Sequence, residues 1–589
     1  MALKRTGRPV PNPALPARSP YNRCKSHNSQ GKAMGKGTDK TQMAQANHDG
    51  SGVSMASLVA WAGRVRKSSP VALIEECTPE ELRDLVSSVS FPEEFRFGVA
   101  TAGFQNEGGF NGHNEPKNNW ADWEIAGRAE PSGKAVMFWQ QPERHIEAAA
   151  SMGLNAFRMS IEWARVFPTE RMAIGGPPEP DIEAVKRYAR IVRDLRKTGM
   201  EPLITLHHFT HPRWLGMDAW SRDSTIERFL EYVSYTLDTL NSNLVANSEA
   251  PLRHIVTFNE PNALAPASYL IGMFPPGRRG HLRETVGALD RLLAAHIKAY
   301  NVIHDLYEVK GWDPPSVSTN IFFCWTWPLG QVVVDLLLAR EAGVPPNDSD
   351  LLAYVRDSVW RFSFAASQDP MYPKGIGSLV ERLLQRCWPL VAPSRLPLWM
   401  ESLYGARRES CLDYISIDYY DPFIGNGLRK PGRNHGFGQE WSPVIKLWEQ
   451  TFHPTGLSRA AEAACQNAPH KPLVIAENGM SSPTFDGLSY GRPDGVTRDF
   501  FIRRHLAEIY RILSAGLRVE GYYHWTLFDN YEWGSYAPRF GIFGVDRTTD
   551  PPTLLETDAM GIDAAAAYRQ AIAAMRSGDP DLVVNELLK

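Results

Sequence analysis

The feature that most constrains this chain is a regular alternation of short apolar runs with amphipathic helical patterns, which begins at Phe91. Each apolar run has the length of a β-strand. Eight such runs follow one another along the chain: 95–102, 155–163, 201–209, 253–261, 316–323, 411–420, 472–479 and 519–528. Helical patterns lie between them. In residues 183–199, the apolar side chains fall on one helical face and Gly199 supplies the C-terminal stop.

Eight strand–helix units in one uninterrupted domain predict an α/β fold, a (β/α)8 or TIM barrel with a single catalytic domain. A doubly wound parallel sheet is the alternative, but no GxGxxG motif follows any of the strands. The stretch from Trp327 to Ser410 is harder to interpret. We expect it to form helices and loops that are inserted after the fifth strand, over one face of the barrel.

The composition excludes several classes of protein. A chain of 589 residues, 43% of them hydrophobic, can bury a large core, and its net charge of −3 gives no reason to expect a nucleic-acid partner. The six cysteines include no CxxC pair, which excludes a zinc ribbon and argues against a disulfide scaffold. We expect mostly buried thiols. No apolar run approaches the roughly 18 residues of a membrane span.

Residues 1–77 are expected to form a disordered, basic extension, and residues 78–589 the folded catalytic domain. The extension is rich in Gly, Ser, Asn, Pro and Lys and lacks periodicity. It has no apolar segment of the secretory type, so we expect a cytoplasmic protein. Residues 1–50 contain nine basic residues (Lys and Arg) and two Asp, so targeting to an organelle stays as an alternative. Order is predicted to begin at Thr78, which stands three residues before Glu81 as in a capping box.

Two glutamates stand at the ends of predicted strands, where a barrel of this type builds its active site. Glu260 lies in the sequence TFNEP at the end of the fourth strand, and Glu477 lies in IAENG at the end of the seventh. These strands lie on opposite sides of the barrel mouth, so the two carboxyl groups can face each other across it. Such a pair suits glycoside hydrolysis, in which one group protonates the leaving oxygen and the other meets the anomeric carbon. A single glutamate at a strand end is more often a solvated rim residue, so the prediction depends on the pair.

These motifs resemble the signatures of glycoside hydrolase family 1, the retaining β-glycosidases. TFNEP is similar to the acid/base motif of that family, and IAENG is similar to its nucleophile motif. The sequences FRFGVATAGFQNEGG, FRMSIEWARVFP and WTLFDNYEWGSYAPRFGIFGVD are similar to its first, second and last strands, in the family's order. The resemblance runs from about Phe91 to Tyr568, and it implies an O-glycosyl hydrolase.

The resemblance also implies roles at the reaction centre. Glu260 would be the acid/base and Glu477 the nucleophile. Arg158 would keep Glu477 ionised through its opposite charge, and Tyr420 would donate a hydrogen bond to it. The two glutamates would stand roughly 5–5.5 Å apart, as in retaining enzymes. Charge on Glu477 should then raise the pKa of Glu260, which suits a proton donor.

The other matched residues would bind the sugar. Asn259 would hold the hydroxyl next to the reacting carbon, and Trp525 would form the floor of the pocket. The residues expected to contact substrate are Gln105, His208, Asn259, Tyr420, Trp525, Glu532 and Trp533. The expected partner is a small β-glycoside. No cofactor is expected, because a carboxylate and a proton suffice for this reaction.

Residues 205–215, TLHHFTHPRWL, contain three histidines and raise the alternative of a metal site. His207 and His208 are neighbours on a strand, so they point to opposite faces and cannot both enter one pocket. A zinc site needs three or four converging ligands. The resemblance assigns His208 to hydroxyl recognition and leaves His207 in packing. We therefore expect no metal here.

Two regions depart from the family pattern. Asp418 stands in SIDYY, where the family usually has Asn. Its carboxyl group can bind hydroxyls as Asn does, and it can raise the pKa of Glu477 by like-charge repulsion. The loop between Glu532 and Arg539 is one residue shorter than usual, which leaves the preference for glucose, galactose or fucose open. Glu532 itself argues against the 6-phosphosugar branch, which has a smaller residue there to admit phosphate.

Three functions remain as alternatives from the sequence. The first is a retaining β-glycosidase, most simply a β-glucosidase that acts on terminal non-reducing residues by double displacement. The second is a transglycosylase, which passes the glycosyl group to an acceptor alcohol or glycolipid instead of water. The third, from another class, is a catalytically silent sugar-binding relative, and the presence of both Glu260 and Glu477 argues against it. The aglycone and the oligomeric state are not predicted by any of these patterns.

Overall fold

The computed structural model describes residues 77–110, 112–169, 179–324, 328–369, 392–422, 447–485, 488–492 and 494–589. The extension predicted for residues 1–77 therefore lies outside the described residues, apart from Cys77. Four cysteines lie in the described ranges, and they are buried free thiols as expected: Cys77, Cys324, Cys411 and Cys465. Within these ranges, no helix combines the length and the apolarity that crossing a bilayer requires.

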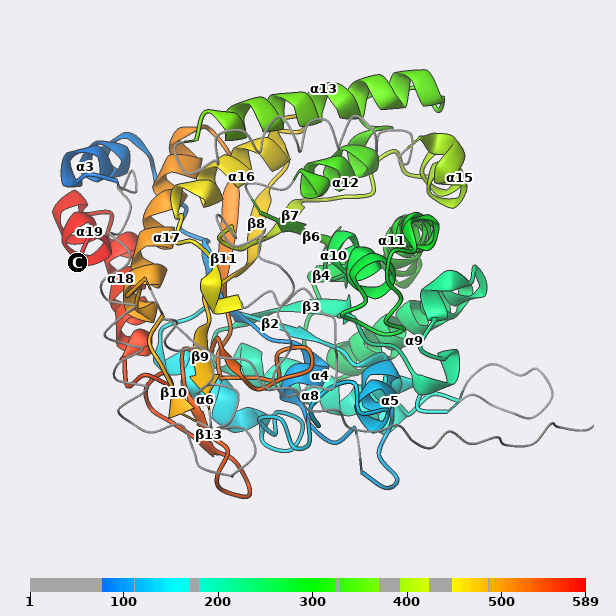
Figure 1. Ribbon diagram of the computed structural model, residues 1–589, viewed down its shortest axis with the longest axis horizontal. Coiled ribbons are helices and arrows are strands. Elements are labelled where there is room, and N and C mark those ends of the chain that lie inside the picture. The colour runs from blue at the N-terminus through cyan, green and yellow to red at the C-terminus, as the bar shows by residue number, and fades with distance from the viewer. Residues whose placement is uncertain are drawn as a thin grey trace, which may run out of the picture. The chain divides into compact units, whose positions relative to one another are not determined.

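All eight predicted strands are present and form one parallel sheet, in which the fifth is interrupted at Thr319 (Figure 1). The strands are β1 (Arg96–Ala100), β2 (Ala156–Ser160), β3 (Glu201–His207), β4 (His254–Phe258), β5 (Ser316–Ser318), β6 (Asn320–Phe323), β7 (Ile415–Tyr419), β8 (Leu473–Asn478) and β11 (Val519–Trp525). Their order is β5-β4-β3-β2-β1-β11-β8-β7-β6. Because β5 and β6 are the two halves of one interrupted strand, the ends of this order meet, and the predicted TIM barrel is confirmed.

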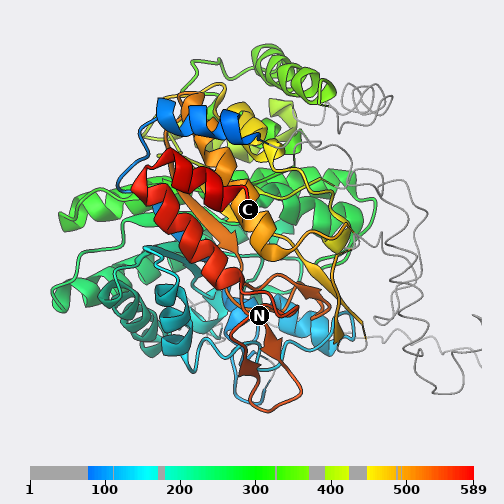
Figure 2. The ribbon, with the colours of Figure 1, turned by 90° about the vertical axis from the view of Figure 1, so that its left-hand side faces the viewer.

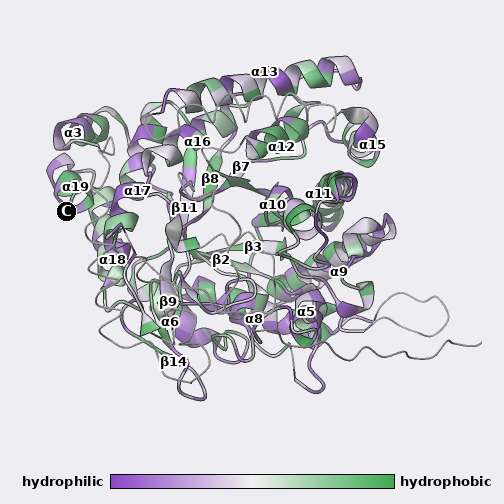
Figure 3. Cartoon of the chain, in the orientation of Figure 1, coloured by the Kyte–Doolittle hydropathy of each residue, from purple (hydrophilic) through white to green (hydrophobic). Residues whose placement is uncertain are grey.

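Two apolar clusters account for the sequence pattern of the strands. One cluster includes Leu203, Val256, Val474 and Tyr523, from β3, β4, β8 and β11, and it fills the inside of the barrel. The other, much larger cluster joins the outer strand faces to the helices. A strand buried on both faces needs apolar residues along its whole length, which is why the strands read as continuous apolar runs. Figure 3 shows these hydrophobic residues along the strands and on the helices around them.

Helices cover the outside of the barrel (Figure 1). The longer ones are α3 (Pro79–Ser88), α6 (Pro142–Ser151), α8 (Ile182–Lys197), α9 (Ser224–Ala246), α11 (Leu282–Lys310), α12 (Leu329–Leu338), α13 (Asp348–Ser367), α15 (Pro397–Gly405), α16 (Thr455–Cys465), α17 (Arg498–Ser514), α18 (Ala564–Ser577) and α19 (Pro580–Leu587). Shorter elements follow the strand ends: α4 (Gly103–Asn106), α5 (Asn119–Ile125), α7 (Trp163–Val166), α10 (Pro261–Pro266), β9 (Ser482–Phe485), β10 (Leu488–Ser489), β12 (Pro538–Arg539), β13 (Val545–Asp546) and β14 (Thr553–Leu554).

Local sequence signals set the ends of several helices. The side chain of Asp181 caps α8 by accepting hydrogen bonds from the N–H groups of Glu183 and Ala184. Gly199 follows that helix with a φ of 81°, which a residue without Cβ adopts at little cost. At the start of α3, Thr78 Oγ1 accepts a hydrogen bond from the N–H group of Glu81 at 3.1 Å, as its position in the sequence predicts.

The stretch between Trp327 and Ser410 contains helices, as predicted. They are α12, α13 and α15, and α12 packs against β6, the strand that precedes the insertion. On another side, the C-terminal helices α18 and α19 lie beside α17 and α3 (Figure 2). An ion pair between Arg83 and Asp581 joins α3 to α19. The last two helices thereby close the outer layer of the barrel against the first described helix.

Candidate active site

The barrel gathers the carboxyl ends of its strands at one mouth, and the predicted catalytic residues lie there. Arg158 is in β2, Asp418 in β7 and Glu477 in β8. Asn259 and Glu260 directly follow β4. Arg158 and Glu477 are 319 positions apart in the chain and form a direct hydrogen bond. Only closure of the barrel brings them into contact.

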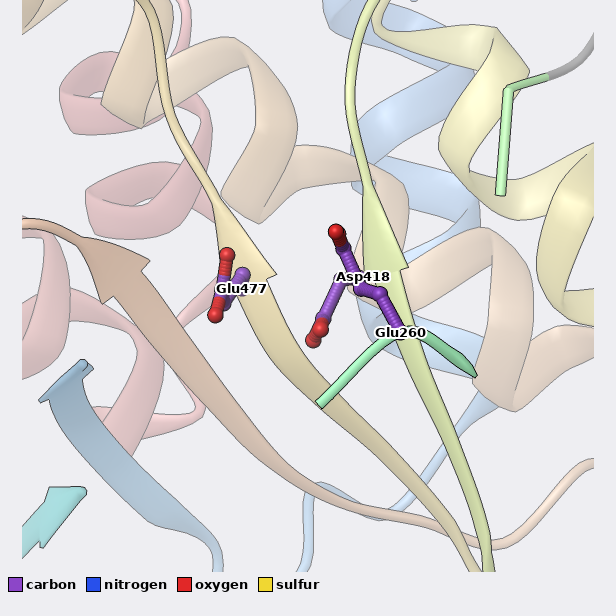
Figure 4. Close-up of side chains that lie close together, drawn as sticks. All are labelled: Glu260, Asp418 and Glu477. Atoms are coloured by element: carbon purple, nitrogen blue, oxygen red, sulfur yellow. The ribbon is translucent and has the colours of Figure 1, made fainter. Parts of the chain in front are cut away.

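Glu260, Asp418 and Glu477 form a compact group of carboxyl groups (Figure 4). One carboxylate oxygen of each lies within 4.8 Å of those of the other two. All three side chains are buried. This close approach of Glu260 and Glu477 fits the roughly 5–5.5 Å expected between the two carboxyl groups of a retaining glycosidase, and it is shorter than the separation in inverting enzymes.

Arg158 is fully buried and connects the residues of the site. Its Nη1 donates a hydrogen bond to Glu477 Oε1 at 2.6 Å, and its Nη2 donates to Asn259 Oδ1 at 2.5 Å. Its Nε donates to Thr205 Oγ1 at 3.1 Å. The other oxygen of Glu477 accepts a hydrogen bond from the hydroxyl of Tyr420 at 2.8 Å. Both oxygens of Glu477 are therefore held, one by a cation and one by a phenol.

The two glutamates differ in their affinity for a proton. Burial raises the pKa of Glu260 well above its usual value, and the charges of Glu477 and Asp418 act in the same direction. Burial also raises the pKa of Glu477, but the charge of Arg158 and the hydrogen bond from Tyr420 act against it. A proton is therefore favoured on Glu260 over Glu477, and the charge of Glu477 raises the pKa of Glu260 in the direction expected from the sequence.

The backbone around Glu260 is tied to the neighbouring strand β6. Glu260 has a φ of 42°, a left-handed conformation that costs a non-glycine residue about 1–3 kcal/mol and is found most often at functional sites. Its N–H group donates to the carbonyl of Asn320 at 3.0 Å. The side chain of Asn262 donates to the carbonyl of Phe322 at 2.9 Å and accepts from its N–H group at 3.1 Å. These bonds fix the direction in which Glu260 points.

The model of the family described as glycosyl hydrolase family 1 matches residues 87–354 and 410–557. The chain belongs to glycosyl hydrolase family 1. It is therefore a glycosidase by family, and Glu260 and Glu477 both lie inside the matched ranges. The unmatched stretch between the two ranges contains α15 and the end of α13, which belong to the predicted insertion.

The names of the curated relatives of this family 1 chain refer to different sugars. It is 26% identical to the 6-phospho-beta-galactosidase of Lacticaseibacillus rhamnosus over 78% of this chain and 94% of the relative. It is 26% identical to the beta-galactosidase of Sulfolobus acidocaldarius over 78% of this chain and 92% of that protein. The chloroplastic galactolipid galactosyltransferase of Arabidopsis thaliana is also 26% identical, over 74% of this chain and 58% of the relative.

Solved structures of low identity share the fold of this family 1 chain. The beta-glucosidase from Thermotoga maritima in complex with castanospermine is 20% identical, with a TM-score of 0.58 over 82% of this chain and 98% of that chain. The beta-glycosidase from Pyrococcus horikoshii is 24% identical, with a TM-score of 0.55 over 85% and 99% of the two chains. At this identity the likeness shows the barrel and leaves the substrate open.

Two predicted sugar-binding residues, Gln105 and Glu532, contact each other. Gln105 Nε2 donates a hydrogen bond to Glu532 Oε2 at 2.9 Å. Burial, followed by the charge of Glu477, raises the pKa of Glu532 to about 8. Glu532 is therefore largely protonated at neutral pH, so that its carboxyl group can both donate and accept hydrogen bonds. This combination suits recognition of sugar hydroxyl groups.

Replacing Glu532 by Gln is expected to make stability less dependent on pH. Between its usual pKa of 4.5 and its folded value of about 8, the folded protein keeps a proton on Glu532 that the unfolded chain releases. The contribution of Glu532 to the stability of the folded protein is thus fully present below pH 4.5 and is lost as the pH rises toward 8. Melting temperatures of both proteins across this range test the expectation. A difference between wild type and Glu532→Gln that stays constant with pH would contradict it.

The aromatic part of the predicted pocket surrounds His208. Its imidazole stacks on the rings of Trp525 and Trp533, each with a centroid distance of 5.8 Å. Burial, and next the charge of Arg158, lower the pKa of His208 well below its usual value, so the ring is neutral. A neutral imidazole offers one donor and one acceptor, which suits a sugar hydroxyl.

The neighbouring histidines have other partners. His207 accepts a hydrogen bond from Trp220 Nε1 at 3.3 Å and lies against the ring of Phe258, in the packing role expected for it. The ring of His211 is hydrogen-bonded to the carbonyl of Gly216 at 2.9 Å. The rings of His207 and His211 also stack on each other with a centroid distance of 6.4 Å, whereas the ring of His208 stacks on Trp525 and Trp533.

Two contacts of the site were absent from the sequence-based prediction. Thr205 binds the guanidinium of Arg158, and Asn320 binds the N–H group of Glu260 through its carbonyl. Thr205 stands as a polar residue in an apolar run, and a polar side chain within a strand that is buried on both faces is the signal that could have identified it, because a buried polar group needs a partner. The carbonyl of Asn320 belongs to the backbone, so no residue type marks that contact in the sequence.

Proposed function

We propose that this family 1 protein is a retaining β-glycosidase, most simply a β-glucosidase, that hydrolyses terminal non-reducing β-D-glycosyl residues by double displacement. The observation that supports this proposal is the asymmetry of the carboxyl pair. Glu477 is ionised and oriented by Arg158 and Tyr420, whereas Glu260, across a gap of less than 4.8 Å, keeps its proton. A nucleophile and an acid are thereby prepared for the same bond.

In the first step, Glu477 attacks the anomeric carbon and forms an ester with the sugar. The bond to the leaving oxygen breaks, and Glu260 gives that oxygen its proton, so the aglycone departs as a neutral alcohol. The negative charge that was on Glu477 moves to Glu260. Arg158 lies 2.6 Å from Glu477 and its charge also acts on Glu260, and burial of the site keeps water from competing with its contacts.

In the second step, water takes the place of the aglycone. Glu260 is now ionised and accepts a proton from the water as its oxygen attacks the anomeric carbon. The ester bond to Glu477 breaks, and the sugar leaves with the β configuration with which it entered, because the carbon has been inverted twice. Both glutamates return to their initial protonation states. Every proton is thus carried by a carboxyl group or water.

For the substrate, we propose an unphosphorylated sugar. Among the relatives are proteins named 6-phospho-beta-galactosidase. In this chain, Glu532 occupies the matched position at the far edge of the sugar and is bound to Gln105. The volume of its carboxyl group opposes a phosphate there, and the fraction that is ionised opposes it by charge as well. Neutral hydroxyl groups can instead hydrogen-bond to both Gln105 and Glu532.

A second candidate is transfer of the glycosyl group to an acceptor alcohol or glycolipid. It uses the same first step and replaces water by the acceptor hydroxyl in the second. The likeness to the galactolipid galactosyltransferase of Arabidopsis thaliana, 26% identical over 74% of this chain, favours its inclusion. The two candidates differ only in which molecule reaches the anomeric carbon of the glycosyl-enzyme.

A panel of nitrophenyl β-glycosides tests the proposal. It should include glucoside, galactoside, fucoside and the 6-phosphorylated glucoside and galactoside. We expect nitrophenol and free sugar in equal amounts, with the β-anomer formed first by NMR. Nitrophenol without matching free sugar would favour transfer, and first formation of the α-anomer would contradict retention. A clear preference for the phosphorylated glycosides would contradict the assignment of Glu532.

A further inference from the structure

Asp418 lies beside the two glutamates of the proposed catalytic pair. In the barrel sheet it is opposite Phe322 of β6 on one side and Glu477 of β8 on the other. Its side chain has no exposed surface, and its Oδ1 lies 3.6 Å from Arg158 Nη1. It stands where the family pattern has Asn, so this chain has a third ionisable group at the reaction centre. The two-carboxyl mechanism gives that group no role.

The charges around Asp418 do not balance if all three carboxyl groups are ionised. The charged and titratable side chains that face it are Arg158 from β2, Glu260 from the turn after β4, Tyr420 at the end of β7 and Glu477 from β8. Arg158 is the cation whose charge acts on all three carboxyl groups. One buried cation can compensate one buried anion, and a further buried charge that is left uncompensated is strongly destabilising.

The distances decide which carboxylate Arg158 stabilises most strongly. Arg158 Nη1 is 2.6 Å from Glu477 Oε1 but 3.6 Å from Asp418 Oδ1. Glu477 also has the hydroxyl of Tyr420 at 2.8 Å. The negative charge is therefore held on Glu477, and the repulsion that the sequence led us to expect on Glu477 falls on its neighbours. Burial and the charge of Glu477 raise the pKa of Asp418 well above its usual value.

We propose that Asp418 holds a proton in the resting enzyme, as a neutral counterpart of the Asn it replaces, and that its ionisation at alkaline pH makes Glu260 hold its own proton more tightly. The second part rests on the proposed function, in which the proton of Glu260 is delivered to the leaving group. Asp418 is thus a positioning residue that acts through the charge of the site. It keeps the acid form of Glu260 present at a pH where a two-carboxyl site would have lost it.

The kinetic test is the pH profile of kcat/KM for Asp418→Asn and wild type. The amide is nearly isosteric and stays neutral at every pH, so Glu260 should lose its proton earlier. We expect the alkaline limb of the variant to move to lower pH by about one unit, a tenfold change in proton affinity. The acid limb should stay in place, because Asp418 is neutral there in both proteins. An alkaline limb that does not move would overturn the coupling to Glu260.

Asp335→Asn is the matched control for this substitution. Asp335 is a fully buried aspartate in α12, bound to the side chains of Gln331 and Asn467 away from the site. Burial raises its pKa to about 7, so the same chemical change is made at another buried carboxyl group. Its variant should keep both limbs of the wild-type profile. A profile shifted equally in both variants would also overturn the coupling, because the shift would then come from loss of any buried carboxyl group.

An infrared difference spectrum at neutral pH tests the protonation state without any turnover. In the spectrum of wild type minus Asp418→Asn, we expect one positive C=O band of a protonated carboxyl group, which the variant lacks. A positive carboxylate band in its place would overturn the proposal, since Asp418 would then be ionised at rest. If wild type cleaves no glycoside at all, the proposed function fails, and the infrared result alone still decides whether Asp418 holds a proton.

Discussion

Glu477→Gln is expected to abolish turnover of every β-glycoside that the wild type cleaves, with kcat lower by a factor on the order of 10⁴–10⁶. The amide of Gln does not form the ester with the anomeric carbon, so neither step of the double displacement can proceed. The fold should persist, because an amide fills the same volume and its oxygen can still accept from Arg158, which now holds Glu477 Oε1 at 2.6 Å. Release of nitrophenol from the best glycoside of the panel measures the loss.

Glu508→Gln is the matched control for that variant. Glu508 is a buried glutamate on α17 that accepts a hydrogen bond from Ser458 Oγ at 2.7 Å, outside the barrel mouth. The control makes the same chemical change and should retain turnover close to wild type. If Glu477→Gln kept comparable activity while remaining folded by circular dichroism, Glu477 would not be the nucleophile.

Glu260→Gln is expected to lose activity in a way that depends on the leaving group. General acid catalysis contributes about 10²–10⁴-fold, so alkyl glycosides, whose alcohols need a proton to depart, should be cleaved slower by that factor. Dinitrophenyl glycosides need little protonation, so their first step should be slowed far less. Their second step still lacks the base that activates water. A burst of dinitrophenol equal to the amount of enzyme, followed by slow turnover, is the expected time course.

Rapid-mixing kinetics with one alkyl and one dinitrophenyl glycoside would measure both effects. Gln is a suitable replacement because Glu260 is neutral at rest, so the variant preserves the charge of the resting site. An equal loss for both leaving groups would contradict the acid role of Glu260. Absence of the burst would contradict its role as base in the second step.

Much of the fold could be predicted from local sequence patterns. Each strand buried on both faces requires a continuous apolar run, and this requirement made all eight visible. Interruption of the fifth strand at Thr319 could not be predicted, because Thr favours strands and residues 316–323 contain neither Gly nor Pro to mark a break. The insertion was predicted only as helices and loops, since helical periodicity does not tell which outer surface a helix covers.

Within the site, the position of the two glutamates was predictable and their environment was not. Glu260 and Glu477 could be found because they end strands, and strand ends of a parallel barrel meet at one mouth. Asp418 could be recognised as unusual, but its effect could not be assigned. Which carboxyl group pairs with Arg158 depends on two distances from its Nη1, 2.6 Å to Glu477 and 3.6 Å to Asp418. That difference of 1 Å depends on the register of β7 against β8, which is a feature of the tertiary structure.

The sequence by itself determined the number and order of the strands, the amphipathic helices between them and the two glutamates at strand ends, because these follow from periodicity over a few residues. Only the tertiary structure decided that Arg158 holds Glu477, that Asp418 is adjacent to it, and that burial and neighbouring charges raise the pKa of Glu260. The physical reason is that burial and charge–charge distances set proton affinities. Both arise only when strands hundreds of residues apart close into one barrel.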